Sequence, residues 1–200
     1  MPRLPLRSAL LLILWALLAA CGSQEQLLNS ERIERKFGSY GLDVLKANAA
    51  LRVSSLYSGS GDAKITRTFA VVRFTRRTVR AYEQEHAQIM AGGSIGAVFK
   101  AADWDIEKIN VFIGEMEVPA KYPLLSELMQ IELPKFLAAH VYVLVVRKQE
   151  RSYEYATIVE LHHPDYLTAD DLQAIYGEIV FDDSPRFTLD DYIDPAIWEN

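Results

Sequence analysis

HVYVLVVRKQERSYEYATIVEL, residues 140–161, is the stretch that decides the fold. Its two halves, 140–147 and 153–161, are rich in the β-branched and aromatic residues that strands favour. The polar residues 148–151 (KQER) join them, so the stretch predicts a hairpin. Strands joined by so short a connection are antiparallel, and this indicates the class of the sheet.

Further strand-like runs lie earlier in the chain, at 41–46, 51–57 and 64–74. The turn sequence SGSGD at 58–62 separates the second run from the third. We predict a three-stranded meander, in which ITRTFAVVRF at 65–74 is the central strand of the sheet. Another strand is predicted from about residue 106 to 113.

The remaining segments have a helical pattern. After residue 79 the apolar residues recur at a helical period, which predicts a helix to about residue 90 and a second, short helix capped by Ser94. Pro123 begins a third helix, and Thr168 with Asp171 caps a last one. The order is therefore βββ–αα–β–α–ββ–α. Because hairpins outnumber long crossovers, we predict an α+β fold with a mostly antiparallel sheet and with the helices packed on one face.

Composition fits one globular domain, since the 200 residues are 50% hydrophobic and 24% charged. Ten of the 27 acidic residues lie between 164 and 200, where Arg186 is the one basic residue. The segment 21–163 is nearly neutral, so nucleic acid is not expected as a partner. A single cysteine excludes an intramolecular disulfide and a cysteine-based metal site. No metal or other cofactor is predicted.

The first twenty residues have the pattern of an export signal. Arg3 and Arg7 make the start of the chain positive, and residues 9–20 are apolar without interruption. This run is shorter than the ~18–20 apolar residues that cross a bilayer as a helix. We therefore predict a signal peptide at 1–20.

The apolar run ends in Leu18-Ala19-Ala20-Cys21, which closely resembles the bacterial lipobox. The resemblance implies transfer of a diacylglyceryl group to the Cys21 thiol, cleavage before Cys21 and N-acylation. The mature protein would then be a lipoprotein anchored to a membrane of the cell envelope through acyl chains on Cys21. Gly22, where Asp would signal retention, implies the outer membrane facing the periplasm. An ordinary signal peptide with an incidental cysteine is the alternative.

Three further regions follow the signal peptide. We predict a lipidated N-terminus and a short, helical or semi-ordered tether at 21–38, and the α+β domain at 39–177. The segment 178–200 is predicted to be an acidic arm that packs on the domain, because its aromatic residues are not typical of a free tail.

Gly92, Gly93, Ser94 and Gly96 form the most site-like loop of the chain. Glycines and a helix start offer free N–H groups to an anion. Ser94 could act as a nucleophile if a histidine served as its base. A helix–helix corner explains the same glycines without a ligand, and the loop matches neither GxxxxGK[ST] nor GxSxG.

The histidines are candidate bases or metal ligands. His162 and His163 end a strand, where adjacent residues point to opposite faces, so we expect solvated side chains rather than a metal site. His86 lies on the apolar face of its helix with Glu83 three residues earlier. We favour a half-buried structural role for His86 over that of a base oriented by a carboxylate.

Five arginines within fourteen residues form a candidate basic patch: Arg67, Arg73, Arg76, Arg77 and Arg80. They could meet phosphate or anionic headgroups, or pair with the acidic arm, which we favour because the charges are opposite. The arm has its own cluster of aspartates: Asp182, Asp183, Asp190, Asp191 and Asp194. Their spacing does not fit a calcium loop, so we expect an acidic, soluble arm.

These observations support three hypotheses about function. The first is a membrane-anchored envelope lipoprotein with a non-enzymatic binding or assembly role, whose partner is another envelope protein or a small ligand. The second is a tethered hydrolase or transferase that uses the Ser94 loop with His86 or His162. The third is a small-ligand-binding module with a cleft between the sheet and the helices, which a buried apolar pocket lined by convergent polar groups would favour.

Overall fold

The computed structural model describes residues 27–75, 79–177, 179 and 189–191. Outside these residues lie the predicted signal peptide, Cys21, Arg76, Arg77 and most of the predicted acidic arm, including Asp182, Asp183 and Asp194. None of the helices in the described ranges is both long and apolar enough to cross a membrane.

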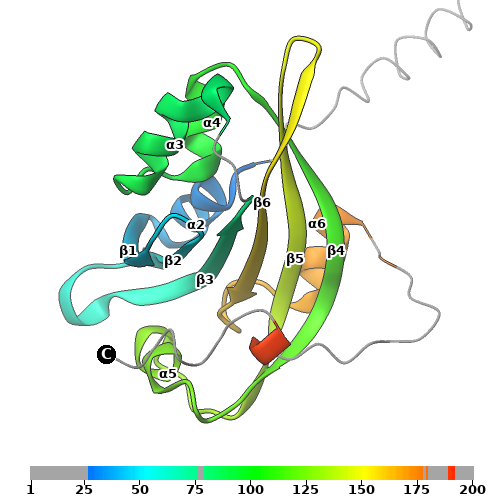
Figure 1. Ribbon diagram of the computed structural model, residues 1–200. Coiled ribbons are helices and arrows are strands. Elements are labelled where there is room, and N and C mark those ends of the chain that lie inside the picture. Colours follow the sequence, from blue (N-terminus) through cyan, green and yellow to red (C-terminus); the bar gives the residue numbers. More distant parts are fainter. Residues whose placement is uncertain (1–26, 76–78, 178, 180–188, 192–200) are drawn as a thin grey trace, which may run out of the picture.

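A six-stranded antiparallel sheet forms the centre of the molecule (Figure 1). Its strand order is β1-β2-β3-β6-β5-β4. The strands are β1 Gly41–Ala47, β2 Leu51–Ser58, β3 Ile65–Phe74, β4 Asp105–Val118, β5 Lys135–Lys148 and β6 Arg151–His162. The predicted α+β class and antiparallel sheet are confirmed. The predicted central strand, β3, lies between β2 and β6.

The hairpin of β5 and β6 extends beyond the apolar residues that predicted it. Strands β5 and β6 pair from Lys148 and Arg151 inward, which leaves a two-residue turn at Gln149 and Glu150. Gln149 has φ 57°, the left-handed conformation that tight hairpin turns require. Polar residues of the predicted loop are therefore part of the strands.

The helices cover both faces of the sheet. Helices α2 Asn29–Phe37, α3 Glu83–Met90, α4 Ile95–Ala101 and α6 Ala169–Tyr176 pack on one face, and α5 Pro123–Met129 packs on the other. Figure 1 shows α3 and α4 beside the upper half of the sheet and α5 below it. The prediction that the helices share one face is thus wrong for α5.

The reason lies in the central strands, which are buried on both sides. In β3, Phe69 and Val71 pack with Leu125 and Met129 of α5. Ala70 and Val72, the alternate residues of the strand, belong to the opposite face. There Ala70 packs with the cluster under α2 and α6, and Val72 packs with the cluster under α3 and α4. A strand with two buried faces needs cover on both.

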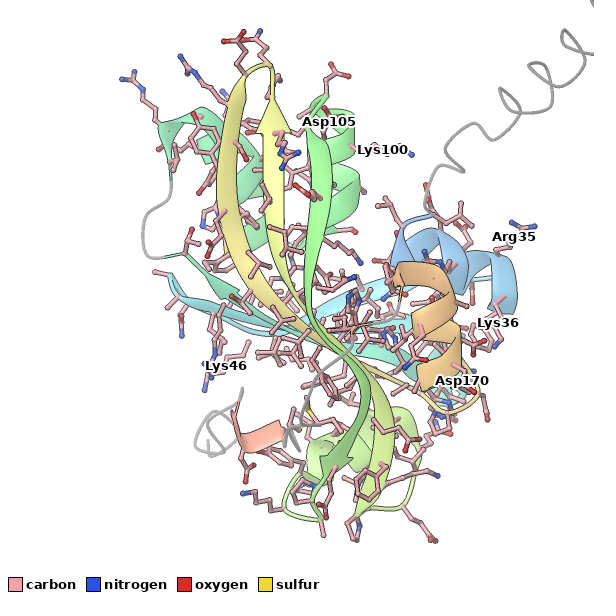
Figure 2. The ribbon with its side chains drawn as sticks, turned by 90° about the vertical axis from the view of Figure 1, so that its right-hand side faces the viewer. Arg35, Lys36, Lys46, Lys100, Asp105 and Asp170 are labelled. Atoms are coloured by element: carbon pink, nitrogen blue, oxygen red, sulfur yellow. The ribbon has the colours of Figure 1, made fainter. Side chains whose placement is uncertain are left out.

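Helix α2 belongs to the folded domain. Its Ile33 is 0% exposed and packs with Leu56, Ala70 and Leu172. Gly38 ends the helix with φ 76°, a left-handed conformation that glycine adopts readily. Arg35, on the other side of α2, points into solvent (Figure 2). The domain therefore begins before residue 39, because the described part of the predicted tether is bound to the sheet.

Candidate functional site

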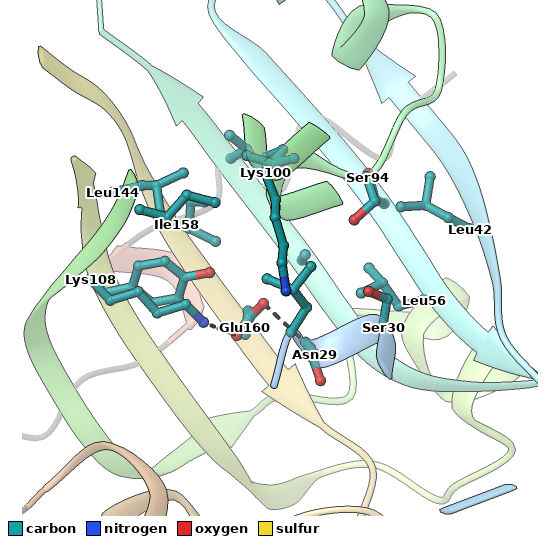
Figure 3. A pocket seen from close by; sticks show the side chains of 18 of the residues that line it. Asn29, Ser30, Leu42, Leu56, Ser94, Lys100, Lys108, Leu144, Ile158 and Glu160 are labelled. Carbon is teal, nitrogen blue, oxygen red and sulfur yellow. Dashed lines mark hydrogen bonds and ion pairs between the residues drawn. The ribbon is translucent and has the colours of Figure 1, made fainter. Parts of the chain in front are cut away.

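A cavity of about 360 Å³ lies between the sheet and helices α2 and α4 (Figure 3). This volume is within the roughly 300–1,000 Å³ that small-molecule sites occupy. Most of its wall is apolar. The apolar wall residues are Leu27, Leu28, Leu42, Leu56, Ala70, Val72, Ile95, Trp104, Ile106, Leu144 and Ile158.

The strand pairing explains why the sheet is hollow here. Ser54, Ala70, Glu160 and His140 are direct partners across β2, β3, β6 and β5. The first two side chains of this row are short, so the helices above leave space over them. Ser54, Ala70 and Glu160 of this row all line the cavity.

Glu160 and Lys108 form the polar floor of the cavity (Figure 3). Glu160 is 6% exposed. Its Oε2 lies 3.9 Å from the Lys108 Nζ, which is too far for a hydrogen bond. Its Oε1 accepts a hydrogen bond from the Asn29 side chain at 3.4 Å. Oε2 is enclosed, and no hydrogen bond of ordinary geometry from a described residue reaches it. Burial, and to a lesser extent the neighbouring Glu160 carboxylate, raises the pKa of the Tyr142 hydroxyl.

Lys108 is held in place by aromatic side chains. Its ammonium group donates to the Tyr176 hydroxyl at 3.2 Å and lies 4.3 Å from the centroid of the Tyr142 ring. Burial raises the pKa of Glu160, but Lys108, together with His162, His140 and Asn29, outweighs burial and lowers it overall. The floor is therefore a carboxylate and an ammonium group, side by side but not in direct hydrogen bonding.

A buried hydrogen-bond network supports this floor from behind. The Tyr166 hydroxyl donates to Asn29 Oδ1 at 2.6 Å, and Asn29 Nδ2 donates to Thr68 Oγ1 at 3.1 Å. Thr68 Oγ1 lies 3.0 Å from the His162 Nδ1. The network fixes the Asn29 amide, and through it one oxygen of Glu160.

Two histidines of this region are buried and uncharged at neutral pH. His140 contacts Asn110 Oδ1 through Nε2 at 2.8 Å. Burial lowers the pKa of His140 to about 3 and that of His162 to about 4, although Glu160 opposes both shifts. His140 Nδ1 and His162 Nε2 have no hydrogen-bond partner in the part of the chain that the structure describes. Such buried unsatisfied groups reduce stability, so they call for an explanation beyond packing.

Arg52 forms the wall next to α3. The side chain is 1% exposed, and its Nη1 donates to the carbonyl oxygens of Ile89 and Gly93 at 2.9 and 2.8 Å. Its Nε donates to Ser54 Oγ at 2.9 Å. The carbonyls at the end of a helix carry partial negative charge, which favours a cation there. Arg52 therefore joins the sheet to the α3–α4 corner.

The loop predicted as an anion site has a packing role. Gly93 supplies a carbonyl to Arg52, and a side chain on Gly96 would meet Leu28 at 2.8 Å. Helix α4 has only seven residues, and Ser94 caps it without a side-chain hydrogen bond. Ser94 and Gly96 do line the cavity. The glycines thus allow α2 to approach α4, as expected of a helix–helix corner.

The structure does not pair Ser94 with a base. His86 Nδ1 lies 3.0 Å from the Tyr155 hydroxyl, and His162 Nδ1 contacts Thr68. In the described segments no hydrogen bond joins Ser94 to a histidine, and neither His86 nor His162 lines the cavity. His86 is half-buried, as expected. The His86 ring packs edge-on against Phe74, with ring centroids 4.9 Å apart. The neighbouring Glu85 accepts a hydrogen bond from Trp104 Nε1.

The expectation that His162 and His163 are solvated is wrong. Their exposed fractions are 1% and 6%. Tyr166 covers His162, with ring centroids 5.8 Å apart, and His163 Nδ1 accepts a hydrogen bond from the Asp165 N–H at 3.0 Å. The turn after β6 folds back over the strand end and buries both rings.

The described arginines do not form one patch. Arg67 is buried, donates to Ser58 Oγ at 2.8 Å and stacks 3.9 Å from the Phe37 ring centroid of α2. Arg73 and Arg80 are exposed. A bulge in the β2–β3 pairing at Leu56 and Tyr57 turns Arg67 towards α2. The candidate patch is therefore wrong for Arg67.

A short part of the acidic arm packs on the domain. Leu189 is buried in the α5 core, and Asp190 accepts hydrogen bonds from Lys121 and Tyr122. The charge partner of Asp190 is thus a lysine rather than the arginines. Within the described residues no group of three or more acidic, histidine or cysteine side chains could hold a metal ion.

Glu160, Lys108 and Asn29 were not among the predicted site residues. A signal was present for Glu160, since it is a charged residue near the end of an apolar strand run. Lys108 similarly interrupts a strand that begins with Ile106. Asn29 gave no signal, because it lay in a segment predicted as a tether.

No protein-family model, curated protein or solved structure matches this chain.

Proposed function

We propose that this protein is a lipid-anchored envelope protein with a non-enzymatic role, and that it binds a small, largely apolar ligand in the cavity between the sheet and α2 and α4. The cavity carries this proposal. It combines an apolar wall with a few convergent polar groups, which is the usual composition of a ligand site.

Binding of a small ligand is favoured over docking of a protein on a surface patch. The exposed large apolar side chains in the described ranges are Leu27, Ile109, Val111 and Phe136. They are divided between the N-terminal side of α2, the middle of β4 and the start of β5. Protein-docking surfaces usually gather such residues into one larger patch.

A tethered hydrolase or transferase has less support. That reaction class needs a nucleophile within hydrogen-bond reach of its base. Ser94 lines the cavity, but the described histidines contact Tyr155, Thr68, Asn110 and the Asp165 backbone instead. The cavity therefore offers binding groups without an assembled catalytic pair.

The envelope location rests on the lipobox at 18–21. We expect mass spectrometry of the protein from its own cells to show a chain that begins at Cys21 and carries acyl groups. The Cys21→Ala variant is expected to lose the acyl groups and to leave the membrane fraction. An unmodified Cys21 in the wild type, or residues 1–20 still attached, would contradict the anchor without bearing on the cavity.

Filling the cavity should weaken ligand binding. Ala70 lies on the cavity floor at the centre of the sheet, so Ala70→Phe places a ring in the empty space. We expect the full chain in lipid nanodiscs to bind the neutral probe N-phenyl-1-naphthylamine, with energy transfer from Trp104. The variant is expected to bind at least about tenfold more weakly, which corresponds to about 1.4 kcal/mol.

Ala101→Phe is the matched control, because Ala101 is exposed on α4. Ala101→Phe is expected to leave probe binding unchanged. The thermal midpoint of unfolding of both variants is expected to stay within a few degrees of the wild-type value. Equal binding by the wild type and Ala70→Phe, after subtraction of the signal from empty nanodiscs, would refute the cavity as the site.

A further inference from the structure

The separation of Glu160 and Lys108 matches that of two groups bridged by one hydroxyl oxygen. The two charged atoms lie 3.9 Å apart. An O–H···O bond spans about 2.7 Å and an N–H···O bond about 2.9 Å. An oxygen that accepts from Lys108 and donates to Glu160 can therefore satisfy both lengths at once, with an angle near 90° at the oxygen. This would also supply the hydrogen bond that Glu160 Oε2 lacks among the described residues.

The charges around this gap favour an uncharged head. Glu160 and Lys108 compensate one another, and a further buried charge, Arg52, is directed to two carbonyls and Ser54. Lys100 and Asp105 also line the cavity, but both are exposed to solvent, and the Lys100 Nζ lies 4.0 Å from Glu31 Oε1. A carboxylate head would face Glu160, and an ammonium head would face Lys108. Either ion would leave a buried charge uncompensated, which is costly in a site of low polarity.

The walls beyond the gap fit an apolar chain. Ile158 lies two residues before Glu160 on the same face of β6, and Leu144 of the neighbouring strand β5 also lines the cavity. Trp104 and Ile106 continue the apolar wall at the base of β4. A volume of about 360 Å³ lies at the small end of the range for ligand sites, so it admits one chain rather than a two-chain lipid.

We propose that the ligand is a single-chain amphiphile with an uncharged hydroxyl head, which lies between Lys108 and Glu160 while its apolar chain packs against Ile158, Leu144 and Trp104. This inference rests on the proposed function, since it names the class of ligand that the cavity takes. Glu160 then excludes anionic head groups and Lys108 excludes cationic ones, which makes the cavity specific for uncharged heads.

The test compares three ten-carbon ligands that differ only in the head: decanol, decanoate and decylammonium. Each displaces N-phenyl-1-naphthylamine from the full chain in nanodiscs at pH 7. The wild type is expected to bind decanol at least about tenfold more tightly than either ion. Glu160→Gln removes the negative charge and should make decanoate the preferred ligand. Lys108→Met removes the positive charge and should make decylammonium the preferred ligand.

The two variants are independent, so a folding defect in one leaves the other as a test. Thermal unfolding checks each. Lys135→Met is the matched control for Lys108→Met, because Lys135 is an exposed residue at the start of β5 that does not line the cavity, and it is expected to keep the wild-type preference. If all three ligands bind equally in wild type and variants, the head-group inference fails while the cavity remains a site. If neither the probe nor any of the ligands binds, the proposed function fails with it.

Discussion

Acidification from pH 7 to pH 4.5 is expected to reduce the free energy of unfolding by about 5 kcal/mol through two histidines alone. An unfolded histidine titrates near pH 6.5, whereas His140 and His162 in the folded protein have pKa values of about 3 and about 4. Between pH 6.5 and pH 4.5 the unfolded state therefore binds more protons than the folded state. Stability falls with pH by about 1.4 kcal/mol per unit for each histidine.

Urea unfolding at the two pH values measures this effect. The double variant His140→Asn/His162→Asn should have a much flatter profile, because neither position can then take up a proton on unfolding. His86→Asn is the control, since His86 is half-buried and has a lowered pKa without a large shift. A double variant that keeps the full wild-type slope would show that other groups cause the acid sensitivity.

Phe99→Ala is expected to destabilise the protein by about 3–5 kcal/mol, the usual cost of removing a fully buried aromatic ring. Phe99 is 0% exposed on α4. Its ring centroid lies 4.9 Å from that of Tyr155 and 5.9 Å from that of Trp104. The substitution removes the side chain that fixes α4 over the cavity, so ligand binding should weaken as well.

Phe136→Ala is the matched control for this prediction. It is the same chemical change at a ring that is 60% exposed on β5. We expect a change in unfolding free energy within about 0.5 kcal/mol for this variant. Similar losses for Phe99→Ala and Phe136→Ala in denaturant unfolding would contradict the role assigned to the aromatic cluster under α4.

The strands were predictable because their signals are local. The runs at 51–57 and 65–74 combine β-branched residues with a turn between them, and the hairpin of β5 and β6 has a short polar connection. The start of α6 was also predictable, because the capping box of Thr168 with Asp171 is a local pattern. Which face a helix covers is not local, and α5 was misplaced for this reason.

The site was not predictable because pairing between distant segments creates it. Lys108 on β4 and Glu160 on β6 meet across β5, which depends on a strand order that spacing alone does not reveal. Asn29 reaches Glu160 from a helix that was predicted as a tether. His162 appeared to be an exposed strand end, but Tyr166 folds back over it. Arg67 does not lie in the predicted patch, because a β-bulge turns its side chain towards α2, and this bulge has no reliable sequence signal.

The buried polar groups connect stability with the proposed function. Glu160, His140 and His162 each have an atom without a hydrogen-bond partner among the described residues. An apolar cluster of similar volume would avoid this cost. The retention of such groups beneath a cavity is consistent with a site that is completed by a ligand, and the ligand hydroxyl would satisfy Glu160.

The most direct test of the cavity as a ligand site is a crystal structure of the protein with 10-bromodecan-1-ol, using the anomalous signal of bromine. The account predicts one bromine position inside the cavity near Leu144 and Trp104, with the hydroxyl oxygen within hydrogen-bond distance of Glu160 and Lys108. Bromine found only on the outer surface, with the cavity unchanged at full ligand concentration, would contradict it.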